Sequence, residues 1–167
     1  MFPKFNIGKS GENYITYLLK KAGFECELNN DYEKRYDYDI SVKMGKLKFT
    51  IESKYDVYSL KSGNIAIEVH NCKQDCPSGV YTTFADIWVQ LIPDKDNADT
   101  ILAYAIKTQD LIHFIETTSP FKKTTASGDK NSNLMIYKKE VILPLFSRFD
   151  HIESKSELKA VFSELLT

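Results

Sequence analysis

The segment YDISVKMGKLKFTIESK, residues 38–54, contains two short apolar or alternating runs joined through Met44-Gly45. Such runs around a glycine-containing turn are typical of a β-hairpin. Because side chains two residues apart leave the same face of a strand, Glu52 and Lys54 should project together. An antiparallel pairing around this turn also places Asp39 beside them. The sequence therefore predicts that two carboxylates and one ammonium group converge at one end of a sheet.

These three side chains have the chemistry needed for metal-assisted hydrolysis of a phosphodiester. Two neighbouring carboxylates raise each other's pKa unless a cation neutralises them. Mg²⁺ usually takes one or two protein carboxylates and completes its shell with water and substrate phosphate. A lysine beside the ion can hold a phosphate oxygen, or position and deprotonate the attacking water. The same spacing also occurs on solvent-exposed strand faces, so a purely structural role for these charges is the alternative.

On either side of this segment, the chain alternates between helix and strand patterns. Ser10 is placed as the N-cap of an amphipathic helix that has Glu12 in its first turn and stops before Gly23. Further elements are expected as follows: strands at 24–28, 39–42, 47–51, 65–69, 87–92 and 101–106, a helical turn at 82–86, a helix from the N-cap Thr108 to 116, a polar loop at 117–133, one or two strands in 134–146 interrupted by Pro144, and a last helix started by Ser154 or Ser156. This order predicts an α/β fold with a central mixed β-sheet flanked by helices.

The composition places the chain among ordinary globular proteins. Its 167 residues are 43% hydrophobic and 27% charged, as expected for a single domain over residues 1–167. Three cysteines are too few for a disulfide scaffold and fit a reducing compartment. Residues 1–9 lack the long apolar region of a secretory signal, and no apolar run reaches the ~18–20 residues that cross a bilayer. We therefore expect an intracellular protein without a membrane partner.

The lysines are unevenly distributed along the chain. A net charge of −1 argues against a generic basic coat for nucleic acid. However, residues 41–61 hold five lysines against two acidic residues, and residues 118–139 hold five against one. Within the second region, Lys122 and Lys123 suit contacts with DNA backbone phosphates, and a solvated loop is the alternative. One basic face is therefore compatible with a phosphate-bearing partner.

Other residues have two interpretations each. Thr82 and Thr83 follow Ser78-Gly79, where hydroxyls and backbone amides can form a nest for a DNA phosphate or simply cap a helix. Glu68 interrupts an apolar run, so it is either a further acid of the site or a side chain that points outward at a sheet edge. Four tyrosines flank the expected site and are candidates for stacking on unpaired bases: Tyr32, Tyr36, Tyr55 and Tyr58.

The acidic residues and the lysine together resemble a known motif. Glu12, Asp39 and Glu52-Ser53-Lys54 resemble the PD-(D/E)xK nuclease superfamily, which has a glutamate on the first helix, an aspartate on one core strand and (D/E)-x-K on the next. The run Lys9-Ser10-Gly11-Glu12, before a helix ending at Ala22-Gly23-Phe24, is similar to archaeal-type Holliday-junction resolvases and to phage or viral relatives. Tyr38 stands where the name-giving proline would be. The resemblance covers residues 1–55, and the later chain looks more like restriction-like relatives.

The resemblance implies a restriction-endonuclease-like core and a specific set of roles. Asp39 and Glu52 would ligate Mg²⁺, with Glu12 acting directly or through a bound water, Mn²⁺ would substitute for Mg²⁺, and Lys54 would assist the attacking water. The expected DNA contacts are Lys9, Ser10, Thr82, Thr83, Lys122 and Lys123.

The resemblance also implies an activity and a partner. We expect a Mg²⁺-dependent DNA endonuclease that selects branched DNA, as Holliday-junction resolvases do, and that acts on no small-molecule substrate. A small nuclease that has to cut two strands usually forms a homodimer, which has two sites. The alternatives are a sequence-specific endonuclease of the restriction or homing type, and a non-catalytic nucleic-acid-binding domain with this fold.

Overall fold

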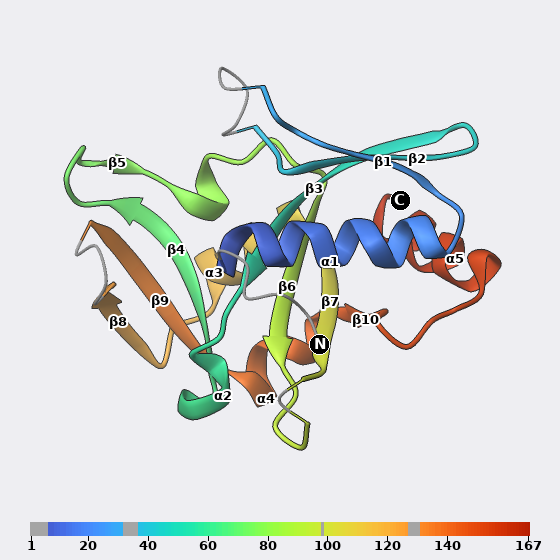
Figure 1. The fold of residues 1–167 in the computed structure, drawn as a ribbon. Helices are drawn as coiled ribbons and strands as arrows, with labels where there is room; N and C mark the ends of the chain where they lie inside the picture. The colour runs from blue at the N-terminus through green and yellow to red at the C-terminus, as the bar shows by residue number, and fades with distance from the viewer. Residues whose placement is uncertain (1–6, 32–36, 98, 127–130) are drawn as a thin grey trace.

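The computed structural model describes residues 7–31, 37–97, 99–126 and 131–167, and the side chains of these ranges from Ser10 onward (Figure 1). The helices are α1 (Ile7–Lys21), α2 (Ser59–Ser62), α3 (Thr108–Thr117), α4 (Lys139–Ile142) and α5 (Lys155–Leu165), with 3₁₀ turns η1 (Gly79–Tyr81) and η2 (Leu143–Leu145). The strands are β1 (Glu25–Leu28), β2 (Ile40–Met44), β3 (Leu47–Tyr55), β4 (Asn64–Asn71), β5 (Cys76–Pro77), β6 (Ile87–Pro93), β7 (Ile101–Lys107), β8 (Lys122–Thr125), β9 (Ser132–Lys138) and β10 (Ser147–Arg148). No helix in these ranges combines the length and apolar character needed to span a membrane.

The central sheet has the strand order β1-β2-β3-β6-β7-β10. Strands β1, β2 and β3 form an antiparallel meander, β3 and β6 run parallel, and β6, β7 and β10 are again antiparallel. The parallel pair requires a crossover, which the chain makes through residues 56–86 and a second sheet. Helices lie in front of and behind the central sheet in Figure 1, so the predicted α/β class with a central mixed sheet is confirmed.

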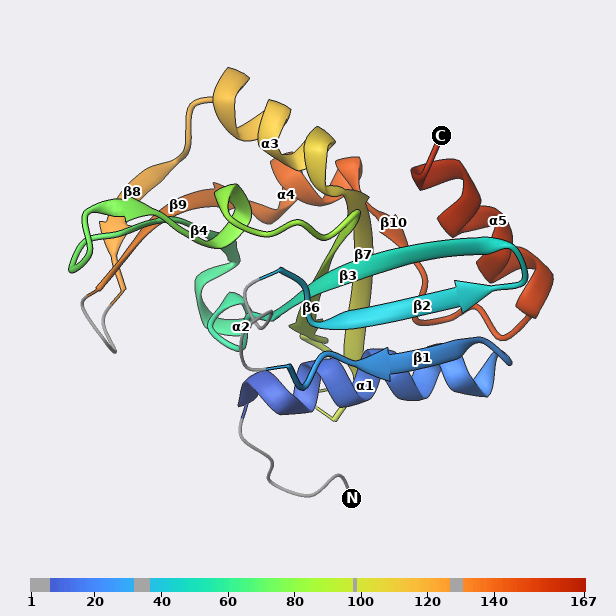
Figure 2. The ribbon, with the colours of Figure 1, turned by 90° about the horizontal axis from the view of Figure 1, so that it is seen from above.

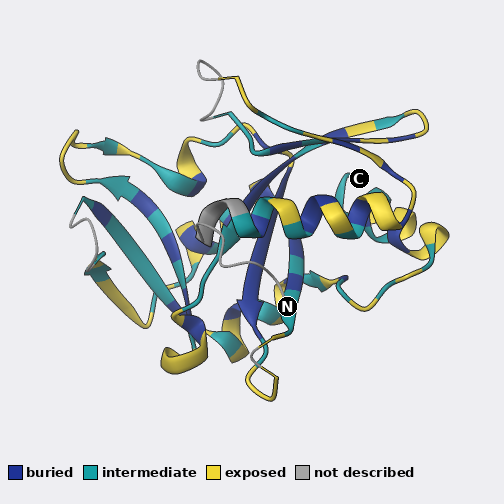
Figure 3. Cartoon of the chain, in the orientation of Figure 1, coloured by how far each residue is buried: buried dark blue, intermediate teal, exposed yellow. Residues whose placement is uncertain are grey.

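The alternation of side chains along β3 and β6 divides the interior into two cores. Ile51 and Leu91 belong to the core that contains Ile15 and Leu19 of α1 and Phe162 of α5. The alternate residues of the same strands face the opposite side, where Trp88 joins a core with the apolar residues of α3 and the second sheet. Figure 2 shows α1 and α3 on opposite sides of the central strands, and Figure 3 shows the buried residues concentrated in those strands. Glu52 and Lys54 alternate with Ile51, so they leave β3 on the side away from α1.

The hairpin predicted from residues 38–54 is present. Ile40 pairs with Ile51 and Met44 pairs with Leu47, which leaves Gly45 and Lys46 to form the turn. Gly45 has a φ of 65°, a conformation that glycine adopts without steric cost. Strand β3 extends beyond the predicted apolar run to Tyr55, and this extension carries the candidate catalytic residues into the middle of the sheet.

The second sheet, with the order β5-β4-β9-β8, was not predicted. The segment expected to be a polar loop at 117–133 instead contains β8, in which Thr124 pairs with Leu134 of β9. The prediction was wrong because β8 is an edge strand of lysine and threonine and lacks an apolar alternation. The region 134–146 also differs from expectation, since β9 is followed by α4 and η2, and Pro144 lies in that 3₁₀ turn.

The sequence placed some helix starts incorrectly. Helix α1 begins at Ile7, so Ser10 lies inside the helix and Glu12 lies in its second turn rather than at the N-terminus. Thr108 is the first residue of α3 and Lys107 is the N-cap, and the expected helical turn at 82–86 is the earlier 3₁₀ turn η1. Ser10 and Thr108 are residue types typical of an N-cap, but both lie within their helices. The N-cap Ser154 of α5 is confirmed, because its side chain accepts a hydrogen bond from the Glu157 backbone N–H.

Candidate active site

The hairpin register brings Asp39 beside the end of β3. The Asp39 backbone N–H donates to the Ile51 carbonyl at 2.9 Å, which continues the β2–β3 pairing by one residue. Its carboxylate Oδ2 accepts hydrogen bonds from the backbone N–H of Ser53 at 2.7 Å and from the Ser53 hydroxyl at 3.2 Å. Ser53 therefore holds the carboxylate in place. The sequence did not single out Ser53, although it lies inside the Glu52-Ser53-Lys54 triplet.

Glu52 and Lys54 form a close ion pair on the same face of β3. The Lys54 Nζ lies 2.7 Å from Glu52 Oε1, and the Glu52 side chain is 11% exposed while that of Lys54 is 41% exposed. Beneath them is the buried Trp88, the cross-strand neighbour of Glu52, whose ring centroid lies 5.8 Å from Lys54 Nζ. Because Glu52 is largely removed from water, its attraction to Lys54 is stronger than in a surface ion pair. The buried carboxylate also needs further hydrogen-bond partners.

Thr83 supplies one of these partners. Its Oγ1 donates to Glu52 Oε2 at 3.2 Å, lies 3.1 Å from the carbonyl of Asp37, and accepts from the Ala85 backbone N–H at 3.1 Å. Thr83 was predicted to hold a DNA phosphate, whereas in the structure its hydroxyl contacts the Glu52 carboxylate. The neighbouring Thr82 is exposed and its hydroxyl donates to the Gly79 carbonyl at 3.2 Å.

Glu68 lies in the same cavity, on the wall that β4 provides. Its Oε1 accepts a hydrogen bond from the Ser78 hydroxyl at 2.7 Å, next to a register shift in β4 between Glu68 and His70. The sequence left open whether Glu68 is a further acid of the site or points outward at a sheet edge. Its position in the cavity lining favours the first interpretation. The cavity has a volume of about 590 Å³, and its lining includes Asp39, Glu52, Lys54, Glu68, Thr82 and Thr83.

The electrostatics of the cavity follow from burial and from the opposite charges within it. Burial raises the pKa of Glu52 above its usual range, the charge of Lys54 opposes this rise, and the Asp39 carboxylate adds to it. Burial alone would lower the pKa of Lys54. Attraction to Glu52, Asp39 and Glu68 outweighs burial, so the pKa of Lys54 lies above its ordinary value. Lys54 is therefore a cation at neutral pH.

Replacing Lys54 with methionine should raise the pKa of Glu52 further. The substitution removes the charge that opposes the effect of burial, while the Asp39 carboxylate remains. Because the pKa of Glu52 is higher in the folded than in the unfolded chain, its contribution to stability is present at acid pH and is lost as the pH rises through the folded-state value. Carboxyl ¹³C shifts followed through a pH titration measure this directly. Lys54→Arg, which keeps the charge, should titrate as wild type does, and an unchanged Glu52 pKa in Lys54→Met would show that the ion pair is absent in solution.

Other residues predicted for the site lie elsewhere. Glu12 is on α1, which packs on the other face of the sheet through Ile15 and Leu19, and it is not among the residues that line the cavity. Lys122 and Lys123 lie on β8 and line two other hollows. Ser10 is inside α1, and the Lys9 side chain, Tyr32 and Tyr36 lie outside the described residues. Of the remaining tyrosines, Tyr55 packs against the core with α1, and Tyr58 lines the hollow that contains Lys122.

The donor set in the cavity consists of oxygen atoms from neighbouring carboxylates. In the described ranges, no three His, Cys, Asp or Glu side chains gather closely enough to form a metal site by themselves. Asp39 and Glu52 would therefore act as a pair. Glu12, predicted as a third ligand, is not among the residues that line the cavity, and its role as a ligand stays a prediction.

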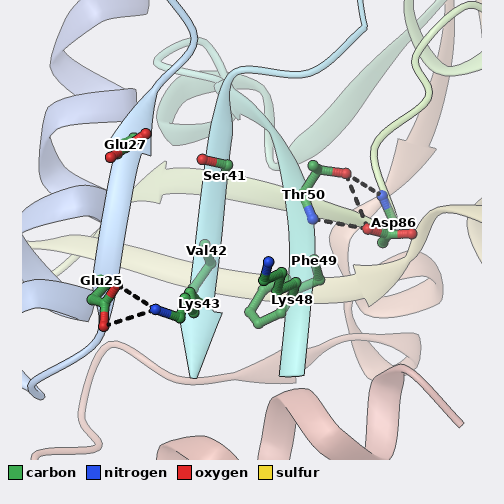
Figure 4. Close-up of a pocket in the computed structure, with 9 residues that line it drawn as sticks. All are labelled: Glu25, Glu27, Ser41, Val42, Lys43, Lys48, Phe49, Thr50 and Asp86. Atoms are coloured by element: carbon green, nitrogen blue, oxygen red, sulfur yellow. Dashed lines mark hydrogen bonds and ion pairs between the residues drawn. The ribbon is translucent and has the colours of Figure 1, made fainter. Parts of the chain in front are cut away.

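A separate hollow of about 370 Å³ lies on the exposed face of β1, β2 and β3. Figure 4 shows its lining, in which Lys43 pairs with Glu25, and Asp86 accepts hydrogen bonds from the Thr50 backbone N–H at 2.8 Å and from the Thr50 hydroxyl at 3.0 Å. The ion pair between Lys43 and Glu25 lies on the exposed face of the sheet, whereas the Glu52–Lys54 pair of the cavity lies over the buried Trp88.

Comparisons with known proteins give a structural similarity but no family match. No protein-family model matches the chain, and no curated protein matches it significantly. Among solved structures, the chain is similar to a bacterial homing endonuclease, I-Ssp6803I, with a TM-score of 0.46 and 17% sequence identity over 64% of this chain and 70% of that chain. These comparisons show no family for the chain.

Proposed function

We propose that this protein is a Mg²⁺-dependent endonuclease that hydrolyses phosphodiester bonds in DNA. The observation that supports this proposal is the convergence of Asp39, Glu52 and Lys54 on one open cavity, with the lysine 2.7 Å from the glutamate. Two carboxylates and a cation are the groups needed to bind a metal ion and a phosphate side by side. These three residues also belong to the set, with Glu12, on which the resemblance to PD-(D/E)xK nucleases rests.

The carboxylates of Asp39 and Glu52 fit a hard divalent cation. Their donors are oxygen atoms only, and Mg²⁺ usually takes one or two protein carboxylates while keeping several waters. The Asp39 charge raises the pKa of Glu52, which is the repulsion that a bound cation would relieve. When bound, the ion supplies charge neutralisation at the phosphate and lowers the pKa of a coordinated water.

Lys54 would hold a phosphate oxygen rather than remove a proton. Its raised pKa keeps it charged at neutral pH, so it is a poor general base and a good partner for the charge that develops on the phosphate. Trp88 below and Glu52 beside it restrict where the ammonium group can lie. On the opposite wall, Glu68 adds a further acid, held by Ser78, that increases the negative potential around the lysine.

The proposed substrate is branched DNA, and the proposed assembly is a homodimer with one cavity in each subunit. Resolving a junction requires two strand cuts, which two copies of a single-site domain supply. Sequence-specific cutting of linear duplex is the competing outcome of the experiment below.

The experiment compares a labelled four-way junction with a linear duplex of the same sequence, each in Mg²⁺ and in EDTA. Wild type should cut the junction only in Mg²⁺ and faster than the duplex, and Glu52→Ala should cut neither. No Mg²⁺-dependent cutting of either DNA would overturn the nuclease assignment in favour of a binding domain. Equal cutting of both forms would leave the nuclease assignment in place and remove the preference for branched DNA.

A further inference from the structure

Phe84 is an exposed aromatic residue directly after Thr83, which lines the catalytic cavity. At 79%, it is the most exposed large hydrophobic side chain among the described residues. It belongs to the segment 82–86, which connects η1 to β6 and includes Thr83, the partner of Glu52. Single exposed hydrophobic residues are common on protein surfaces, so exposure alone assigns no role. What distinguishes Phe84 is how its backbone is held.

The segment 82–86 is hydrogen-bonded to β3 and to the chain that leads into β2. The Phe84 backbone N–H donates to the carbonyl of Asp37, three residues before β2, at 2.8 Å. On one side of Phe84, Thr83 contacts Glu52, and on the other side Ala85 is buried with its N–H bonded to Thr83. Asp86 then joins Thr50 of β3 through the hydrogen bonds shown in Figure 4. The ring therefore extends into solvent from a rigid support.

Phe84 also lies at the boundary between two hollows. Thr82 and Thr83 line the catalytic cavity, and Asp86 lines the hollow on the face of β1, β2 and β3. A nucleic-acid strand that runs from the cavity to the hollow on the sheet would cross the segment 82–86, which carries Phe84. Its nucleotide next to the scissile phosphate would thus meet an aromatic ring.

We propose that Phe84 stacks on an unpaired base next to the scissile phosphate and so makes the enzyme select DNA with an unpaired nucleotide at the cleavage point. This inference rests on the proposed nuclease function and narrows its branched-DNA substrate to branches that carry an unpaired base at the cleavage point. In a fully paired duplex, both faces of each base are covered by its neighbours, whereas an unpaired base can offer a face to an aromatic side chain. A rigidly supported ring loses little conformational freedom on stacking, which favours binding.

The test measures DNA binding in Ca²⁺, separately from cutting. Two DNAs are compared, a duplex with a single-nucleotide bulge and the matched continuous duplex. Wild type should bind the bulged DNA more tightly, and Phe84→Ala should lose about tenfold in this preference, the size of one base–aromatic stack. Phe84→Tyr should keep most of it. Phe121→Ala is the matched control and should bind as wild type does, because Phe121 is also exposed, at 62%, but lies directly before β8 and not next to a residue that lines the cavity.

The outcomes separate this inference from the nuclease assignment. If Phe84→Ala keeps the wild-type preference, the stacking role is wrong even where Mg²⁺-dependent cutting is intact. If Phe84→Ala loses the preference but wild type cuts no DNA, the stacking role stands and the nuclease assignment falls. If wild type binds both DNAs equally, the inference is overturned. Thermal unfolding should be unchanged in Phe84→Ala, because the ring is exposed, and this controls for misfolding.

Discussion

Glu52→Gln and Asp39→Asn should each lower the rate of Mg²⁺-dependent DNA cleavage by at least about 10³-fold, equivalent to about 4 kcal/mol of transition-state stabilisation. Both substitutions keep the size of the side chain and remove one negative charge from the pair that would hold the cation. Asparagine also retains an oxygen that can accept the Ser53 N–H, so the hairpin end should stay folded. Single-turnover rates at saturating DNA give the comparison, because they exclude effects on binding and product release.

Affinity and folding supply the controls for this prediction. In Ca²⁺, both variants should bind DNA within a few-fold of wild type, and their unfolding temperatures should stay close to that of wild type. Glu27→Gln, at an exposed carboxylate on β1 that lines the hollow in Figure 4 rather than the cavity, should cut at the wild-type rate. A residual rate above a tenth of wild type in Glu52→Gln, or loss of folding together with activity, would assign these carboxylates a structural role.

Gly79→Ala should destabilise the fold by about 3 kcal/mol, because two costs combine at this residue. Gly79 has a φ of 57°, which disfavours any residue with a side chain. In addition, a Cβ at this position would overlap the carbonyl oxygen of Glu68 and lie 2.8 Å from the Glu68 Cβ. For a domain of this size, the unfolding temperature should fall by about 6–12 °C.

Gly45→Ala is the matched control for the steric part of this cost. Gly45 has a similar φ of 65°, but no heavy atom lies within 4 Å of a Cβ built there. Its substitution should therefore cost only the conformational penalty, about 1–2 kcal/mol. Equal destabilisation of the two variants would show that η1 can move away from β4, and that the cavity wall carrying Glu68 is adaptable.

The candidate site was predictable to the extent that it is local in sequence. Asp39, Glu52 and Lys54 belong to one hairpin, and the alternation of its strands with the turn at Gly45 determines their register. The hydrogen bond from Thr83 to Glu52 spans 31 residues and depends on the parallel pairing of β3 with β6, which no local pattern encodes. For the same reason the sequence left Glu68 with two interpretations.

The errors have related causes. Glu12 was placed near the site because Ser10 looks like an N-cap, but α1 starts one turn earlier and packs on the opposite face. Strand β8 was missed because its lysines and threonines are exposed at the edge of a sheet. Hydrophobic periodicity reports burial, so an element that buries few side chains leaves little signal in the sequence.

The crossover between β3 and β6 has a consequence for synthesis of the chain. The hairpin with Asp39, Glu52 and Lys54 leaves the ribosome before residues 79–91, which provide Thr83 and the neighbouring parallel strand. A nascent chain thus holds the charged groups with neither the threonine partner nor the buried tryptophan beneath them. On the proposed nuclease assignment, the cavity is complete only after β6 pairs with β3, so we expect DNA cleavage only from chains synthesised past residue 91.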